Sequence, residues 1–232
     1  MRKALILVLI LSILLVPVCS LAAGKATVTK ETFFVLPFLD YHSGVVMAEV
    51  TNTGDKTVVF NGGLVELYNS DGDSIESENL YSCYPSVLGP GESGYLSTEI
   101  GVDEATDKSY IDDYLLTVTG KGENEKETVR LQCEGSFGEY KRSEYWTEYG
   151  VAAMVTNDTD ELLRSIRVVY ALFDAEDNLL GVAGAEPSYV GLPSGQTMEV
   201  RTSIDDDWVE QWATQGAEPA RIEVIAYVEK DL

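Results

Sequence analysis

Apolar and polar residues alternate with a period of two along several segments of the chain. In residues 198–205 the even positions are apolar or threonine and the odd positions are polar, and residues 46–50 and 222–228 keep an apolar residue at every second position. Residues 166–172 form a fourth such segment, with Val169 on the face opposite the apolar stripe. A two-residue period is typical of a β-strand that buries one face.

Glycine, proline, asparagine and aspartate separate these segments, and they favour turns because they tolerate or impose the backbone angles that turns require. One short helix is predicted over 207–212, where Asp207 would cap the first turn. Trp208 and Trp212, four residues apart, would share one face of this helix, and Gly216 would end it. Many short strands with little helix predict an all-β, antiparallel sandwich architecture.

The chain contains an internal repeat. Residues 46–52 and 151–157 are identical at five of seven positions, at an offset of 105. At the same offset, residues 65–69 align with 170–174, and each segment is followed by a polar turn. A period of this length is too long for a solenoid and is typical of a duplicated domain.

Further matches follow in the same order, since the proline- and glycine-containing loop at 88–92 corresponds to 192–196 with a small gap. An ordered series of matches at a nearly constant offset predicts two related modules packed separately. We place the first module at residues 27–132 and the second at residues 133–232.

The N-terminus has the pattern of a secretory signal peptide, expected to span residues 1–23. Arg2 and Lys3 form a basic head, and residues 4–16 are an unbroken apolar run. A retained membrane anchor is the alternative, although this run is shorter than the roughly 20 residues that cross a bilayer comfortably. Lipid attachment at Cys19 is disfavoured because no small residue directly precedes it. The protein is therefore expected to be exported, either secreted or held at the cell surface.

The chain is strongly acidic, with 39 acidic and 16 basic side chains and a formal net charge of −23. Such a surface repels phosphate backbones and anionic lipid headgroups, so nucleic-acid binding and membrane-surface binding are disfavoured. The charge is spread along the chain and 45% of residues are hydrophobic, which is typical of a folded protein. The negative surface is complementary in charge to cations and to basic partners, so it can attract them.

Two cysteines, Cys83 and Cys133, remain once the signal segment is set aside. In an exported protein they can form one disulfide, and closing a loop of this length contributes roughly 4 kcal/mol in the chain-entropy model. The alternative is two buried thiols that pack as small apolar groups. Both alternatives stand at this stage, because the sequence does not show whether the two sulfur atoms meet.

Both repeats carry the same short motifs in the same order. A Val-Thr-Asn strand end places Asn52 and Asn157 at equivalent positions, and the strand ends at 65–69 and 170–174 precede an acidic turn and a Pro/Gly loop. These motifs resemble the FxLYD domain of exported bacterial and archaeal proteins, although Val and Tyr stand where the signature has Phe. The resemblance implies an immunoglobulin-like sandwich for each repeat and no active site. It covers residues 41–119 and 146–228.

Residue types for catalysis are scarce. His42 is the sole histidine, so any Ser-His-Asp or Cys-His arrangement would have to use it, and its place before a strand predicts an exposed or edge position. Zinc requires more His or Cys ligands, and no glycine-rich phosphate loop is present. Carboxylates are abundant, but no flanking pattern selects a pair for glycoside hydrolysis. No cofactor is expected, and an extracellular hydrolase with a carboxylate pair is the alternative function.

Clusters of aspartates are the candidate metal ligands. Asp71 and Asp73 lie in a loop of the first repeat, and Asp205, Asp206 and Asp207 lie in a loop of the second. Calcium favours several oxygen ligands, so these loops are candidate calcium sites. The alternative is that the acids form solvated turns and helix caps.

The segment 138–149 mixes aromatic and charged residues where the modules join. Within it, Tyr145, Trp146 and Tyr149 are the candidate ligand surface, because aromatic faces beside polar groups bind sugars by stacking and hydrogen bonding. The alternative is that these aromatics form the first strand of the second module or pack between the modules.

Taken together, these patterns predict a non-catalytic secreted or cell-surface protein of a bacterium, with two tandem immunoglobulin-like antiparallel β-sandwiches. The expected partner is a protein or glycan of the cell envelope. Since exposed strand edges can pair with another chain, an accessory subunit of an envelope complex is a further alternative.

Overall fold

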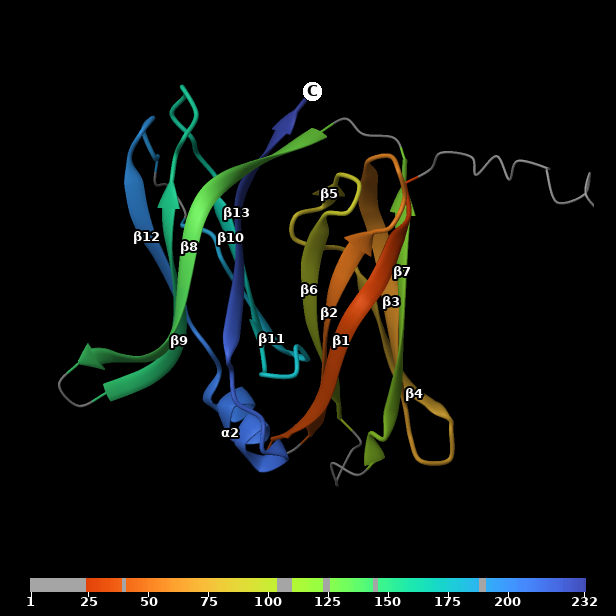
Figure 1. Ribbon diagram of the computed structural model, residues 1–232. Helices are drawn as coiled ribbons and strands as arrows, with labels where there is room; N and C mark the ends of the chain where they lie inside the picture. The colour runs from red at the N-terminus through yellow and green to blue at the C-terminus, as the bar shows by residue number, and fades with distance from the viewer. Residues whose placement is uncertain (1–23, 39–40, 104–109, 123–125, 144–145, 188–190) are drawn as a thin grey trace, which may run out of the picture.

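The computed structural model describes residues 24–232 except 39–40, 104–109, 123–125, 144–145 and 188–190, so the predicted signal segment lies outside the described residues. The chain is all-β and forms two antiparallel sandwiches, one after the other along the sequence (Figure 1). No helix within the described ranges is long and apolar enough to cross a membrane.

The first module consists of two sheets, β1-β2-β6 and β4-β3-β5, and β7 pairs with the other edge of β3. The bounds of its strands are β1 (Ala26–Pro37), β2 (His42–Asn52), β3 (Val58–Tyr68), β4 (Ser74–Leu80), β5 (Val87–Leu88), β6 (Ser93–Val102) and β7 (Asp113–Lys121).

The second module is built on strands in the order β11-β10-β13-β8-β9-β12. Its elements are β8 (Lys126–Ser143), β9 (Trp146–Thr156), β10 (Arg167–Phe173), β11 (Leu179–Ala185), β12 (Thr197–Ser203), helix α2 (Asp206–Gln215) and β13 (Arg221–Asp231).

Each module has its own hydrophobic core, and equivalent strands supply it. Val46, Ala48 and Val50 of β2 are fully buried in the first core, and the residues 105 positions later in β9 are buried in the second. These are the alternating positions that the sequence pattern selects, so the predicted all-β sandwich fold is confirmed.

The boundary between the modules lies earlier than the predicted 132/133. The first part of β8, residues 126–131, pairs with β13, and the rest of the strand pairs with β9. Leu131 belongs to the second core. Residues 126–132 are therefore part of the second module, because one long strand passes from one face of its sandwich to the other.

Helix α2, the one helix within the described residues, begins earlier in the acidic cluster than predicted. Asp205, and not Asp207, is the N-cap residue: its side chain accepts a hydrogen bond from the Asp207 N–H, with 2.9 Å between the two atoms. The helix ends at Gly216, which takes the left-handed conformation expected of a helix C-terminus.

A third hydrophobic core joins the two modules. The outer face of the β1-β2-β6 sheet packs against the outer face of β10 and β11 (Figure 1). Consequently β2 and β10 are buried on both faces, and the four sheet layers form one stack. We call this cluster the inter-module core; its buried members are Phe34, Leu36, Val45, Met47, Tyr95, Val169, Ala171, Phe173, Leu179 and Val182.

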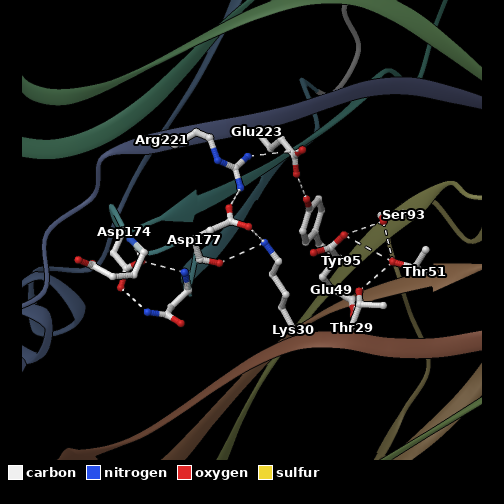
Figure 2. A network of polar contacts seen from close by, with 12 residues as sticks. Thr29, Lys30, Glu49, Thr51, Ser93, Tyr95, Asp174, Asp177, Arg221 and Glu223 are labelled. Atoms are coloured by element: carbon white, nitrogen blue, oxygen red, sulfur yellow. Dashed lines mark hydrogen bonds and ion pairs between the residues drawn. The ribbon is translucent and has the colours of Figure 1, made fainter.

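A charged network crosses the same interface. Asp177, in the turn between β10 and β11, forms ion pairs with Lys30 of β1 and Arg221 of β13, and Arg221 is also paired with Glu223 at 3.5 Å (Figure 2). Glu223 accepts a hydrogen bond from the Tyr95 hydroxyl of the first module. The hydrogen bonds from Lys30 and Arg221 lower the pKa of the Asp177 carboxyl.

The substitution Asp177→Asn is expected to make stability less sensitive to acid. Because the pKa of Asp177 is lower in the folded protein than in the unfolded chain, its ionised form adds stability above the unfolded pKa, and this stability is lost as the pH falls through the folded pKa. Asparagine tolerates the left-handed backbone at this position, where φ is 67°. Urea unfolding between about pH 3 and pH 7 should show a shallower fall for Asp177→Asn than for the wild type.

Asp71→Asn provides the control, since Asp71 lies in the corresponding turn of the first module and has no ion pair described. This variant is expected to keep the wild-type pH profile. An unchanged slope in Asp177→Asn would contradict the role of the network.

Candidate functional site

The first acidic cluster is a structural turn. Asn69 accepts hydrogen bonds at its side-chain oxygen from the backbone N–H groups of Asp71 and Asp73, at 3.0 and 2.9 Å. Asp174 makes the same pair of bonds in the second module. These side chains therefore shape the two equivalent hairpin turns.

The second acidic cluster serves helix α2. Asp205 is its N-cap, and Asp206 and Asp207 occupy its first turn, where negative charge is favoured by the helix dipole. Within the part of the chain that the structure describes, no three His, Cys, Asp or Glu side chains come together as a metal site. The described residues therefore give no geometric support to a calcium site at either cluster.

The structure places only one of the three predicted aromatic ligand residues. Tyr145 and the side chain of Trp146 lie outside the described residues. Tyr149 packs against the second core, with its ring 6.5 Å from that of Trp212 in an edge-to-face arrangement. For Tyr149, the alternative of a packing role is therefore the one observed.

The two cysteines are free thiols. Cys83 is buried in the first core, whereas Cys133 lies beside the second core, with its sulfur 3.4 Å from the Val224 carbonyl oxygen. No disulfide forms because the two thiols belong to different cores. Burial raises the pKa of the Cys83 thiol to about 12, which keeps it protonated and inert.

His42 is buried, not exposed or at an edge as the sequence suggested. It begins β2, the central strand of its sheet, and is 9% exposed, and its Nδ1 atom has no hydrogen-bond partner within the described ranges. It stands opposite Pro37 and Val102 in the sheet.

The edge strand β11 is covered. The indole N–H of Trp212 donates to the Leu180 carbonyl oxygen at 3.0 Å, and the Val182 N–H lies 3.0 Å from the Met47 sulfur. Both backbone groups are therefore engaged, which leaves little of this edge for strand pairing with another chain.

Two pockets lie at equivalent register positions of the two modules. In the second module, Arg167 stands opposite Tyr227 and Val169 opposite Gly184. In the first module, the corresponding pairs are Gly62 with Thr119 and Leu64 with Asn79. All eight of these residues line a pocket in their module. The repeated fold therefore places a pocket at the same position in each module. In the first module the pocket lies on the outer face of the sheet that contains β3, and in the second on the outer face of the sheet that contains β10.

The second pocket is closed on one side by the first module, and we call it the junction pocket. Its volume is about 260 Å³, and Tyr84 of the first module forms one wall. The guanidinium of Arg167 lies 6.0 Å from the centre of the Tyr84 ring. Gly184 forms part of the floor, and a Cβ added there would meet no atom closer than 3.9 Å.

The charges of the junction pocket are mixed. Arg167 lies 3.4 Å from a Glu186 oxygen and 3.6 Å from a Glu229 oxygen, both longer than an ideal charge-assisted hydrogen bond. Glu229 also accepts hydrogen bonds from the backbone N–H and the hydroxyl of Ser86, at 3.0 and 2.6 Å. Its position is therefore fixed by both modules, while the guanidinium retains donors for a ligand.

The most informative group in the junction pocket is the Tyr227 hydroxyl. Tyr227 is fully buried, and no geometric hydrogen bond to its hydroxyl is found within the described residues, although the Arg167 guanidinium is close enough to act on it. Burial raises the pKa of Tyr227, Glu229 adds to this effect and Arg167 opposes it, and the net rise means that the hydroxyl keeps its proton. The pocket therefore contains a neutral hydrogen-bond donor that lacks an acceptor.

The sequence pattern did not point to this pocket. Arg167 and Tyr227 are about 60 residues apart and meet only through strand pairing. A weak signal was present, since Gly184 interrupts a strand, and a glycine inside a strand often marks a place where another group approaches closely.

Comparisons with known proteins add little. No family model matches the sequence, and no curated protein matches it. Among solved structures, red sea bream transglutaminase matches with a TM-score of 0.24 and 10% sequence identity. The match covers 88% of this chain and 30% of the transglutaminase chain, and a TM-score this low carries no argument about fold or function.

Proposed function

We propose that this chain is an exported, non-catalytic binding protein that holds a small polar ligand between two FxLYD-like sandwiches. The observation that carries the proposal is the orphaned Tyr227 hydroxyl in the junction pocket. A buried polar group without a partner costs about 1–3 kcal/mol. A ligand that accepts its hydrogen bond would recover this cost.

The pocket favours a zwitterion of amino-acid size. A ligand carboxylate would accept hydrogen bonds from Tyr227 and Arg167, and an ammonium group would pair with Glu186. The exposed face of Tyr84 offers an apolar surface for the rest of the molecule. A ligand without net charge also avoids the repulsion that an anion would meet on a chain of net charge −23.

A non-catalytic role is supported by the way in which the carboxylates near the pocket are used. Glu229 is engaged by Ser86 and Arg167, and Glu186 is paired with Arg167. Export is supported by the basic head and apolar run of residues 1–23. Fractionation of producing cells should recover the chain outside the cytoplasm.

Thermal unfolding of the purified protein with each of the common amino acids tests the ligand. A ligand present at 100 times its dissociation constant stabilises the folded state by about 2.7 kcal/mol, which is readily seen as a higher Tm. Gly184→Leu is expected to abolish the shift, because its Cβ has room and the rest of the new side chain would occupy space in the pocket. Gly101→Leu is the matched control, since a Cβ added there also makes only ordinary contacts, at 3.5 Å from Tyr41, and Gly101 does not line the junction pocket.

Absence of a shift with every amino acid tested would overturn the assignment of the ligand. A shift that persists in Gly184→Leu would overturn the assignment of the pocket.

Tyr227→Phe separates binding from folding. Without ligand, this variant is expected to be as stable as the wild type or more stable by about 1 kcal/mol, because it removes an unsatisfied buried hydroxyl. With the ligand identified above, its Tm shift should be smaller than that of the wild type. A clear loss of stability in Tyr227→Phe would show that the hydroxyl already has a partner.

A further inference from the structure

We infer that the equivalent groove on the first module is a second binding site, and that it binds a neutral glycan. This groove has a volume of about 330 Å³ and lies over β3, β4 and β7. We call it the outer groove. It lies on the sheet that contains β3, β4 and β7, whereas the first module contacts the second through its other sheet, β1-β2-β6 (Figure 1).

The lining of the outer groove has no charged side chain. Its polar groups are the amides of Asn61 and Asn79 and the hydroxyls of Thr117 and Thr119. In a chain with 39 acidic residues, an uncharged surface of this extent favours a ligand that is neutral. Each amide both donates and accepts, which matches the hydroxyl groups of a sugar.

Tyr81 supplies the aromatic surface. It follows the end of β4, lines the groove, and is 84% exposed. A tyrosine exposed to this degree buries almost none of its apolar ring in the folded chain. Stacking of the ring against the apolar face of a sugar would bury it, while the hydroxyl remains in water.

Gly62 leaves part of the groove floor without a side chain. Gly62 has a φ of +123°, which favours glycine, and it lies where the pairing of β3 with β7 shifts register. A Cβ added there would lie 3.2 Å from the Leu80 carbonyl oxygen of β4, so a side chain would crowd this part of the groove. The absence of side chains at Gly62 leaves room for a ring to lie against the sheet.

The junction pocket and the outer groove thus share a position in the fold but differ in chemistry. Where the junction pocket has Arg167 and Glu186, the outer groove has Gly62 and Tyr81 at the equivalent positions. A glycan bound to the outer groove is therefore independent of any ligand in the junction pocket.

Calorimetric titration with neutral oligosaccharides tests the inference. The probes are cellopentaose, xylopentaose, maltopentaose, mannopentaose and chitopentaose, with an oligogalacturonate as the anionic comparison. At least one neutral probe should bind with a dissociation constant below about 1 mM. Tyr81→Ala should weaken that binding by about tenfold or more, and Tyr81→Trp should preserve it because the stacking face is retained.

Tyr110→Ala is the matched control, since Tyr110 is also an exposed tyrosine of the first module but does not line the groove. This variant and Gly184→Leu should bind as the wild type does. Failure of every neutral probe, or equal binding by Tyr81→Ala, would overturn the inference. A doubling of molecular mass that Tyr81→Ala abolishes would also overturn it, because the groove would then be a contact between two copies.

Discussion

Replacing Phe173 with alanine is expected to lower the free energy of unfolding by about 3–5 kcal/mol and to separate the unfolding of the two modules. Phe173 is fully buried in the inter-module core, where Tyr95 of the first module packs edge-to-face with a centroid distance of 6.4 Å. The cations of Arg221 and Lys30 lie 3.9 and 4.7 Å from its ring centre. The truncation therefore removes apolar contact and two cation–π interactions at one point.

The tryptophans make the separation measurable. All three of them, Trp146, Trp208 and Trp212, belong to the second module. Tryptophan fluorescence therefore follows the second module, while far-UV circular dichroism follows both. In the wild type the two urea transitions should coincide, because the inter-module core joins the modules. In Phe173→Ala the two transitions should no longer coincide.

Phe60→Ala is the control for this experiment, because Phe60 is buried in the first module's own core. It should lower stability while the two transitions remain together. Coincident transitions in Phe173→Ala, or a loss below about 1 kcal/mol, would mean that the modules do not depend on each other for stability.

The inter-module core depends on a second apolar face of β2 and β10 that the two-residue period does not reveal. The chain is continuously apolar over residues 45–48 and 168–173, which is the pattern of a strand buried on both faces. The two-residue period explained only one of those faces, and Val169 was placed opposite the apolar stripe without a partner. Its partner is the β1-β2-β6 sheet of the other module, whose residue Tyr95 is 74 positions earlier in the chain, and neither periodicity nor local turn chemistry identifies such a contact.

The role of the acidic clusters was ambiguous in the sequence for a different reason. The same carboxylates that suit calcium also suit helix N-caps and tight turns, because in each case an oxygen accepts from a positive partner. Asp205 and Asp73 are resolved only by geometry, which places the first on a helix end and the second in a turn closed by Asn69. The candidate pockets were harder still to predict from the sequence, because the residues that line each of them come from three different strands of a module.

The repeat was the most dependable part of the sequence analysis, and Asn157 shows why. Its amide nitrogen donates to the carbonyl oxygens of Glu161 and Leu192, at 2.7 and 2.8 Å, and its side-chain oxygen accepts from the N–H and the hydroxyl of Thr159. The residue is fully buried, so a glycan cannot be attached there, although the sequence fits an acceptor pattern.

Asn52 occupies the same surroundings in the first module. Its amide nitrogen donates to the carbonyl oxygens of Lys56 and Leu88, at 2.8 and 2.9 Å, and its side-chain oxygen accepts from the N–H groups of Gly54 and Lys25. In both modules one side chain therefore ties the end of a core strand to two loops. Few residue types other than asparagine combine these donors and acceptors in one small side chain.

Asn157→Ala is accordingly expected to lower the free energy of unfolding by about 3–4 kcal/mol, because the buried Leu192 carbonyl and the partly buried Glu161 carbonyl lose their donor and two donors of Thr159 lose their acceptor. Asn157→Asp should be nearly as damaging, since it turns a carboxylate oxygen toward the Glu161 and Leu192 carbonyl oxygens. Asn52→Ala should cost a similar amount. Urea unfolding measures all three variants, with Asn79→Ala, an exposed amide, as the control that should remain within about 0.5 kcal/mol of the wild type. A loss below about 1 kcal/mol in both alanine variants would show that the paired asparagines do not hold the two sandwiches together.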